Sequence, residues 1–260
     1  MLFDTHSHYN DEQFDKDRHE VLQRAYESGV KYIISVSSDV SSSIENISIS
    51  QEYEFVYAAI GVHPHNAMDA DNNIMSVFAD FASYSKVIAI GEIGLDYFYE
   101  NSTREAQKIW FAKQISLAVN LKLPIIVHDR EAHEDVLSII KAENAKRIGG
   151  VFHCYTGSVE MAREVLNNNF YISVGGTLTF KNTKKLIDVV KYVPDDMLLI
   201  ETDCPYLTPE PCRGQRNESS FIKYVAGKIA EIKGKTLAEV EAFTTENAKR
   251  LFNIMVGGEV

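Results

Sequence analysis

The residues Asp4-Thr5-His6-Ser7-His8 come directly after a short apolar run at the start of the chain, Leu2-Phe3. His6 and His8 are two positions apart, so in an extended strand both imidazoles point to the same side. Two imidazoles on one side of a buried strand can together hold one divalent metal ion. A single His-x-His pair also occurs by chance on a protein surface, so its meaning depends on the rest of the chain.

Histidines and carboxylates also follow most of the later apolar runs. They are His63 and His65 after residues 55–60, Glu92 and Asp96 after 87–90, His128 after 125–127, His153 after 151–152, and Glu201 and Asp203 after 198–200. In a βα barrel the carboxyl ends of all strands meet at one rim, so residues this far apart in sequence can converge. Four of these histidines and two of these carboxylates gathered there would already be a costly polar cluster without a metal ion. The pattern predicts two divalent ions per chain, with a carboxylate able to bridge them.

The types of side chain in this set also limit the choice of metal. Mixed histidine and carboxylate ligands suit zinc, manganese, iron or cobalt better than calcium. Magnesium stays among the candidates, and the sequence does not identify the native ion.

Eight short runs rich in Val and Ile are expected to be the strands that position these side chains. They cover residues 2–3, 32–36, 55–60, 87–90, 125–127, 151–152, 171–174 and 198–200. The runs are continuous rather than alternating, which is typical of parallel strands buried on both faces. Helical patterns lie between them, so the prediction is an α/β fold, a single (β/α)8 TIM barrel over residues 1–260 with its metal site at the C-terminal rim. The alternative is an open doubly wound sheet, but no glycine-rich nucleotide-binding motif or Walker loop supports it.

Several helix ends are marked by capping signals. Gly29 is expected to end the first helix, and Pro124 requires the helix before it to finish. Ser158 is a candidate N-cap. Residues 102–105 and 236–239 both read as capping boxes that open a helix.

The composition is that of an ordinary globular protein, with 45% hydrophobic and 24% charged residues in a chain of 260. A net charge of -11 argues against a general nucleic-acid coat protein but allows an enzyme that handles a few phosphates. No apolar run reaches the ~18 residues of a membrane span, and no signal peptide is expected. Cys154, Cys204 and Cys212 are expected to be free thiols in a reducing cytoplasm, with Cys154 pointing away from His153. No obligate protein partner is evident.

Together these motifs resemble the TatD family of metal-dependent deoxyribonucleases, a branch of the amidohydrolase superfamily, over essentially the whole chain. The resemblance rests on Asp4 to His8, Gly61-Val62-His63-Pro64-His65, Gly91-Glu92-Ile93-Gly94-Leu95-Asp96, His128, His153 to Gly157, Glu201-Thr202-Asp203, and Arg213-Gly214 through Asn217. Two positions depart from the family pattern. Tyr155-Thr156-Gly157 replaces a Phe-Ser-Gly-like segment, and Ser219 stands where a proline is common, but neither change touches an expected ligand.

The resemblance implies a role for each residue of the expected metal site. His6, His8 and Asp203 would hold one metal ion, and His128 and His153 would hold the other. Glu92 would bridge the two ions, where many amidohydrolases use a carboxylated lysine. Asp203 would also take a proton from the metal-bound water, which makes Asp203 and Glu92 catalytic candidates. Glu201 is a further catalytic candidate, with a role in orienting a ligand histidine favoured over direct catalysis.

The implied function is a divalent-metal-dependent phosphodiesterase that acts on DNA, removing nucleotides from a 3′ end. A zinc-like ion lowers the pKa of its water to about 7, so hydroxide can attack the phosphodiester at neutral pH. The same site would also serve a hydrolase of a small amide, ester or phosphoester, because the metal chemistry does not specify the electrophile. A barrel that binds metal without turnover is a third, less favoured interpretation.

For the residues that could contact substrate, the sequence leaves open whether the role is binding or structural. His63 and His65 would contact a substrate phosphate, although His63 is equally suited to donate a hydrogen bond to a metal ligand. Arg130 would pair with a phosphate or form a surface salt bridge. Arg213 and Arg216 would either neutralise a phosphate or hold the loop in which they lie. The acidic chain is expected to contact only a few phosphates of its DNA partner.

Overall fold

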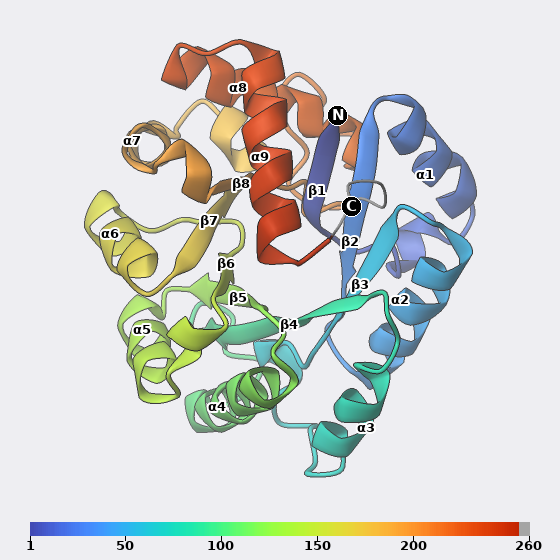
Figure 1. Cartoon of the computed structure of the whole chain (residues 1–260), viewed down its shortest axis with the longest axis vertical. Helices are drawn as coiled ribbons and strands as arrows, with labels where there is room; N and C mark the ends of the chain where they lie inside the picture. The colour runs from blue at the N-terminus through green and yellow to red at the C-terminus, as the bar shows by residue number, and fades with distance from the viewer. Residues whose placement is uncertain (255–260) are drawn as a thin grey trace, which may run out of the picture.

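The structure is a computed structural model that describes residues 1–254. Eight parallel strands follow one another in sheet order from β1 to β8 (Figure 1). The strands are β1 (Leu2–Ser7), β2 (Val30–Val36), β3 (Val56–Ile60), β4 (Val87–Asp96), β5 (Ile125–Arg130), β6 (Gly150–Phe152), β7 (Phe170–Val174) and β8 (Leu198–Ile200). The sheet curves back on itself, because Thr5 on β1 donates a hydrogen bond to the carbonyl of Ile200 on β8 at 2.9 Å. This nearly closed barrel confirms the predicted fold and excludes the open sheet.

The described residues form nine α-helices, of which α1 to α8 lie around the outside of the barrel and α9 lies across one of its ends (Figure 1). They are α1 (Arg18–Glu27), α2 (Val40–Glu52), α3 (Ile74–Phe81), α4 (Arg104–Leu121), α5 (His133–Ala142), α6 (Val159–Asn167), α7 (Lys184–Tyr192), α8 (Ile222–Lys233) and α9 (Leu237–Leu251). None of the helices within residues 1–254 is both long and apolar enough to cross a membrane. Residues 255–260 of the predicted single domain lie outside the described residues.

The barrel contains two apolar layers. One lies between the strands and the surrounding helices, and the other fills the barrel interior. Ala248 on α9 and Phe252 just after it pack into the interior layer with Phe3, Ile34 and Leu199. The C-terminal helix therefore covers the end of the barrel where the strands begin, which leaves the opposite rim as the open end.

Most predicted helix ends are confirmed, but one capping box is wrong. Ser158 accepts a hydrogen bond from the Met161 amide, and the box formed by residues 236–239 is present. At α4 the N-cap is Thr103 instead of Ser102. The buried Ser102 hydroxyl donates to the His65 carbonyl at 2.8 Å and accepts from the Met68 amide at 3.1 Å. Ser102 therefore holds the loop after β3, and the capping role falls to its neighbour.

Two helices had no clear signal in the sequence. The first turn of α2 is rich in serine, which has a modest helix propensity. Asp39 compensates by capping this helix, since its carboxylate accepts from the Ser42 amide at 2.8 Å. The second helix, α3, spans only eight residues.

Candidate metal centre

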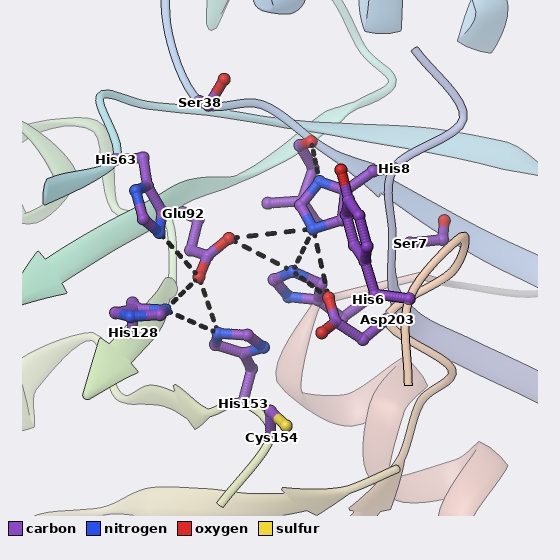
Figure 2. Close-up of polar contacts among 12 residues, drawn as sticks. His6, Ser7, His8, Ser38, His63, Glu92, His128, His153, Cys154 and Asp203 are labelled. Atoms are coloured by element: carbon purple, nitrogen blue, oxygen red, sulfur yellow. Dashed lines mark hydrogen bonds and ion pairs between the residues drawn. The ribbon is translucent and has the colours of Figure 1, made fainter. Parts of the chain in front are cut away.

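Six of the predicted site residues come together at the C-terminal rim around Glu92 (Figure 2). We call these residues the His–carboxylate cluster: His6, His8, Glu92, His128, His153 and Asp203. His6 lies within β1, Glu92 within β4 and His128 within β5, so three of the six sit on strand backbone. The others directly follow or closely follow a strand. Parallel strands therefore fix the positions of side chains that are up to 197 residues apart, from 6 to 203.

One half of the cluster gathers around the Oε2 atom of Glu92. This oxygen lies 3.4 Å from His6 Nε2 and 4.0 Å from His8 Nε2. Asp203 Oδ1 approaches the same two nitrogens, at 3.7 Å from His6 and 3.2 Å from His8. The Nε2 atoms of His6 and His8 are themselves 3.2 Å apart, which confirms that the two imidazoles point to the same side.

The other half gathers around the Oε1 atom of Glu92. This oxygen lies 2.6 Å from His128 Nδ1 and 2.7 Å from His153 Nε2. These two nitrogens are 3.3 Å apart. One carboxylate is therefore shared by two sets of ligand atoms, with a different oxygen facing each set (Figure 2).

Hydrogen bonds on the outer side of two rings fix which nitrogen carries the proton. His8 Nδ1 lies 3.1 Å from the carbonyl oxygen of Val36, and His128 Nε2 lies 3.1 Å from Asp96 Oδ2. Both partners are acceptors, so each of these nitrogens must carry hydrogen. In a neutral ring the remaining nitrogen, His8 Nε2 or His128 Nδ1, then presents a lone pair to the cluster.

These lone pairs face other acceptors. His8 Nε2 faces Asp203 Oδ1 at 3.2 Å, and His128 Nδ1 faces Glu92 Oε1 at 2.6 Å. Two acceptors at such distances repel each other unless a proton or a cation lies between them. The donor set therefore fits divalent metal ions, which imidazole nitrogens and carboxylate oxygens bind together.

The electrostatics of the cluster agree with a cation site. Burial would raise the pKa of Glu92, but the neighbouring His153, His63 and His6 outweigh it and hold that pKa well below its usual range. Burial likewise opposes ionisation of Asp203, yet His8 and His6 lower its pKa. Both carboxylates are thus ionised at neutral pH and can act as metal ligands.

Glu201 lies behind His153 rather than inside the cluster. It is fully buried, and its Oε1 accepts a hydrogen bond from the Cys154 amide at 2.5 Å. The same oxygen is 3.6 Å from His153 Nδ1, which is too long for a hydrogen bond. Glu201 therefore holds the backbone that carries His153. Cys154 lines the same pocket as His153, but its sulfur points away from the His153 ring, as predicted (Figure 2).

His63 and His65 lie beside the second half of the cluster. His63 Nε2 is 3.5 Å from Glu92 Oε1, within reach of a site formed with His128. However, His63 Nδ1 accepts a hydrogen bond from the His65 amide at 3.1 Å. Burial lowers the pKa of His63 to about 4, so the ring is neutral at pH 7 and its proton must sit on Nε2. His63 therefore presents an N–H to the cluster and is suited to donate a hydrogen bond.

Asp96 is a site residue that the sequence motif contained but to which no role was assigned. Its buried Oδ2 lies 2.9 Å from His65 Nε2 and 3.1 Å from His128 Nε2. Its other oxygen accepts from two backbone amides, those of Phe98 and Tyr99. The sequence signal that could have identified Asp96 as a site residue is its spacing, because it lies four residues after Glu92 on the same strand, β4.

The three arginines named from the sequence have different surroundings. Arg130 lines a pocket together with His128, His153 and Asp203. Arg213 is exposed, packs over the Phe180 ring and donates to the Thr208 carbonyl, so it does not touch the cluster. Arg216 forms two hydrogen bonds with Asp17 and thereby holds its loop.

Comparison with known proteins identifies relatives of this chain. A family model described as TatD related DNase matches residues 3–253. YabD of Bacillus subtilis, an uncharacterized metal-dependent hydrolase, is 51% identical over 254 residues, which are 98% of this chain and 100% of YabD. The 3'-5' ssDNA/RNA exonuclease TatD of Erwinia tasmaniensis is 32% identical over 97% of this chain and 100% of its own length.

A solved structure agrees with these relationships. YJJV, a TatD homologue from Escherichia coli, superimposes with a TM-score of 0.92 at 30% identity and covers 98% of both chains. The family match, the relatives and the shared fold all extend over nearly the whole chain. The chain therefore belongs to the TatD-related DNase family of metal-dependent hydrolases.

Proposed function

We propose that this chain is a two-metal phosphodiesterase that removes nucleotides from the 3′ end of single-stranded DNA. The observation that carries the proposal is the shared Glu92 carboxylate, whose two oxygens face two separate sets of ligand atoms. The exonuclease polarity and the single-stranded substrate are supported by the names of relatives such as the Erwinia tasmaniensis enzyme.

The proposed ligands divide between two ions. His6, His8 and Asp203 would hold the first, His128 and His153 would hold the second, and Glu92 would be shared between them. Glu201 and Asp96 support this set from behind, because Glu201 fixes the backbone of the His153 loop and Asp96 fixes the ring of His128.

Bound divalent ions would supply Lewis-acid stabilisation of phosphoryl charge and would lower the pKa of a water molecule. Asp203 is ionised at neutral pH and only 14% exposed, so its carboxylate can accept the proton of the attacking water. His63 donates its Nε2 hydrogen toward a phosphoryl oxygen. Arg130 at the pocket edge supplies positive charge to a phosphate, and His65 and Arg213 are further candidates for phosphate contact.

Digestion of labelled oligonucleotides tests this function. Single-stranded and duplex DNA carrying a 5′ label should be shortened stepwise from the 3′ end, and only when divalent metal is present. Release of the 3′-terminal nucleotide first, with single strands cut faster than duplex, supports the proposal. Hydrolysis of a small chromogenic phosphodiester without digestion of any oligonucleotide would instead favour a small-molecule hydrolase.

We also propose that residues 1–260 form one catalytic domain that works in the cytoplasm; both statements remain predictions from the sequence.

A further inference from the structure

Two adjacent aromatic side chains are exposed at the rim beside the candidate metal centre. Phe98 is 51% exposed and Tyr99 is 55% exposed. Both lie within three residues of the end of β4, the strand that carries Glu92. Their rings meet edge to face, with centroids 4.9 Å apart and planes at 87°. Exposed aromatic rings leave apolar surface in contact with water. An exposed pair beside a site is therefore a candidate surface for binding a ligand.

The backbone that carries these rings is fixed. Asp96 Oδ1 accepts hydrogen bonds from the Phe98 amide at 3.0 Å and from the Tyr99 amide at 2.9 Å. The other oxygen of Asp96 contacts His65 and His128. One carboxylate therefore ties the aromatic pair to the histidines of the site.

Arg130 completes a cationic and aromatic surface. Strand pairing places Arg130 on β5 opposite Asp96 on β4. Its guanidinium carbon lies 4.2 Å from the Phe98 ring centroid and 4.6 Å from the Tyr99 ring centroid. Within residues 1–254, no carboxylate forms an ion pair with Arg130. The guanidinium therefore keeps its charge available in a chain whose net charge is -11.

This surface continues into the candidate metal centre. Arg130 lines the same pocket as His128 and His153. On the other side, the Tyr99 ring contacts the His65 ring at a centroid distance of 5.6 Å. A nucleotide whose phosphate lies at the His–carboxylate cluster would have this aromatic surface next to it.

We propose that Phe98, Tyr99 and Arg130 form a stacking platform for one nucleobase of a single-stranded nucleic acid. This inference rests on the proposed nuclease function and adds to it a binding site for a base. Aromatic rings and guanidinium groups stack on bases of any sequence, because every base has a π-face. A base in a duplex is already paired and stacked, so only an unpaired nucleotide can use the platform. The platform thus gives a physical reason for preferring single strands without reading sequence.

Steady-state kinetics of the metal-loaded enzyme test the platform. The substrates are a single-stranded oligothymidylate and matched strands in which one of the last three 3′ nucleotides lacks its base. Loss of one base stack by alanine substitution weakens binding roughly tenfold or more. The Phe98→Ala/Tyr99→Ala variant should therefore lose about tenfold or more in kcat/KM on the intact strand. The loss should be clearly smaller on the strand that lacks the docked base.

Two further variants separate stacking from a structural role. Tyr99→Phe keeps the ring and should retain most of the kcat/KM on the intact strand. Tyr84→Ala is the matched control, because Tyr84 is 47% exposed but precedes β4 at the opposite end of the barrel. Thermal melting of each variant shows whether the fold is kept.

The outcomes are distinguishable. Wild-type kcat/KM in Phe98→Ala/Tyr99→Ala overturns the platform and leaves the nuclease function standing. An equal loss on the intact strand and on all strands lacking a base also overturns it. If the wild-type enzyme hydrolyses a small chromogenic phosphodiester but cuts no oligonucleotide, the proposed nuclease function fails, and the platform fails with it.

Discussion

Replacing Glu92 with glutamine removes the charge on which both halves of the candidate metal centre depend. The change keeps nearly the same shape but puts an NH2 group where one carboxylate oxygen stands. Glu92 Oε1 lies 2.6 Å from His128 Nδ1, and Glu92 Oε2 lies 3.4 Å from His6 Nε2. Whichever oxygen the NH2 group replaces, one half of the cluster loses an anionic ligand and gains a donor. We therefore expect Glu92→Gln to hold fewer than two ions per chain.

The expected loss of rate in Glu92→Gln can be scaled from the effect of substitutions that do not remove a ligand. Removing a partner that only orients a ligand reduces metal affinity or activity about 10–100-fold. Glu92 is itself a proposed ligand, so its replacement should lower the rate about 100-fold or more. This loss corresponds to about 2.7 kcal/mol of transition-state stabilisation, since each factor of ten is about 1.36 kcal/mol.

The assay compares metal content and hydrolysis rate in the same protein sample. Elemental analysis gives the number of ions per chain, and digestion of a labelled oligonucleotide gives the rate. Glu105→Gln on α4 is the matched control, because it makes the same charge change at an exposed position in the first turn of that helix, outside the cluster. Two ions per chain together with a near-normal rate in Glu92→Gln would refute the bridging role.

Three further predictions follow from the site. Asp96→Ala removes the acceptor that holds the His65 and His128 rings, so metal affinity measured by titration should fall about 10–100-fold; unchanged affinity would contradict this role. In metal-free protein burial lowers the pKa of His153, but Glu92 and Glu201 outweigh it and raise the pKa well above 6.5. Protonation of His153 stabilises the fold fully below pH 6.5, and this stabilisation is lost as the pH rises through the raised pKa. The free energy of unfolding, measured by denaturant titration, should therefore fall above pH 6.5. A rise would contradict the argument. Binding of single-stranded DNA to Asp203→Asn should show a salt slope of about -1.5 to -2, from two or three phosphates, whereas a slope steeper than about -4 would indicate an extended basic track.

The barrel and the ligand set were predictable because they depend on strong local patterns. Each of the eight Val/Ile-rich runs became a strand, and the polar residues that follow them met at the rim by topology alone. The helix α2 was not predictable in the same way, since its serines have modest helix propensity and its start depends on the Asp39 cap. Ser102 read as a cap in sequence but is held elsewhere by contacts with residues more than 30 positions away.

The finer roles at the site depend on atoms that a sequence does not place. The proton on His63 Nε2 follows from a single hydrogen bond between His63 Nδ1 and the His65 amide. The stacking of Arg130 on Phe98 depends on the pairing of β4 with β5. The first depends on the local conformation of the loop after β3 and the other on strand pairing, and neither follows from residue types alone.

The most direct measurement of the central claim is a metal titration of chelator-treated enzyme, with bound ions and oligonucleotide hydrolysis measured on the same samples. We predict no hydrolysis in metal-free protein and a rate that reaches its full value when two divalent ions are bound per chain. Full hydrolysis by protein that elemental analysis shows to be free of metal would contradict the account.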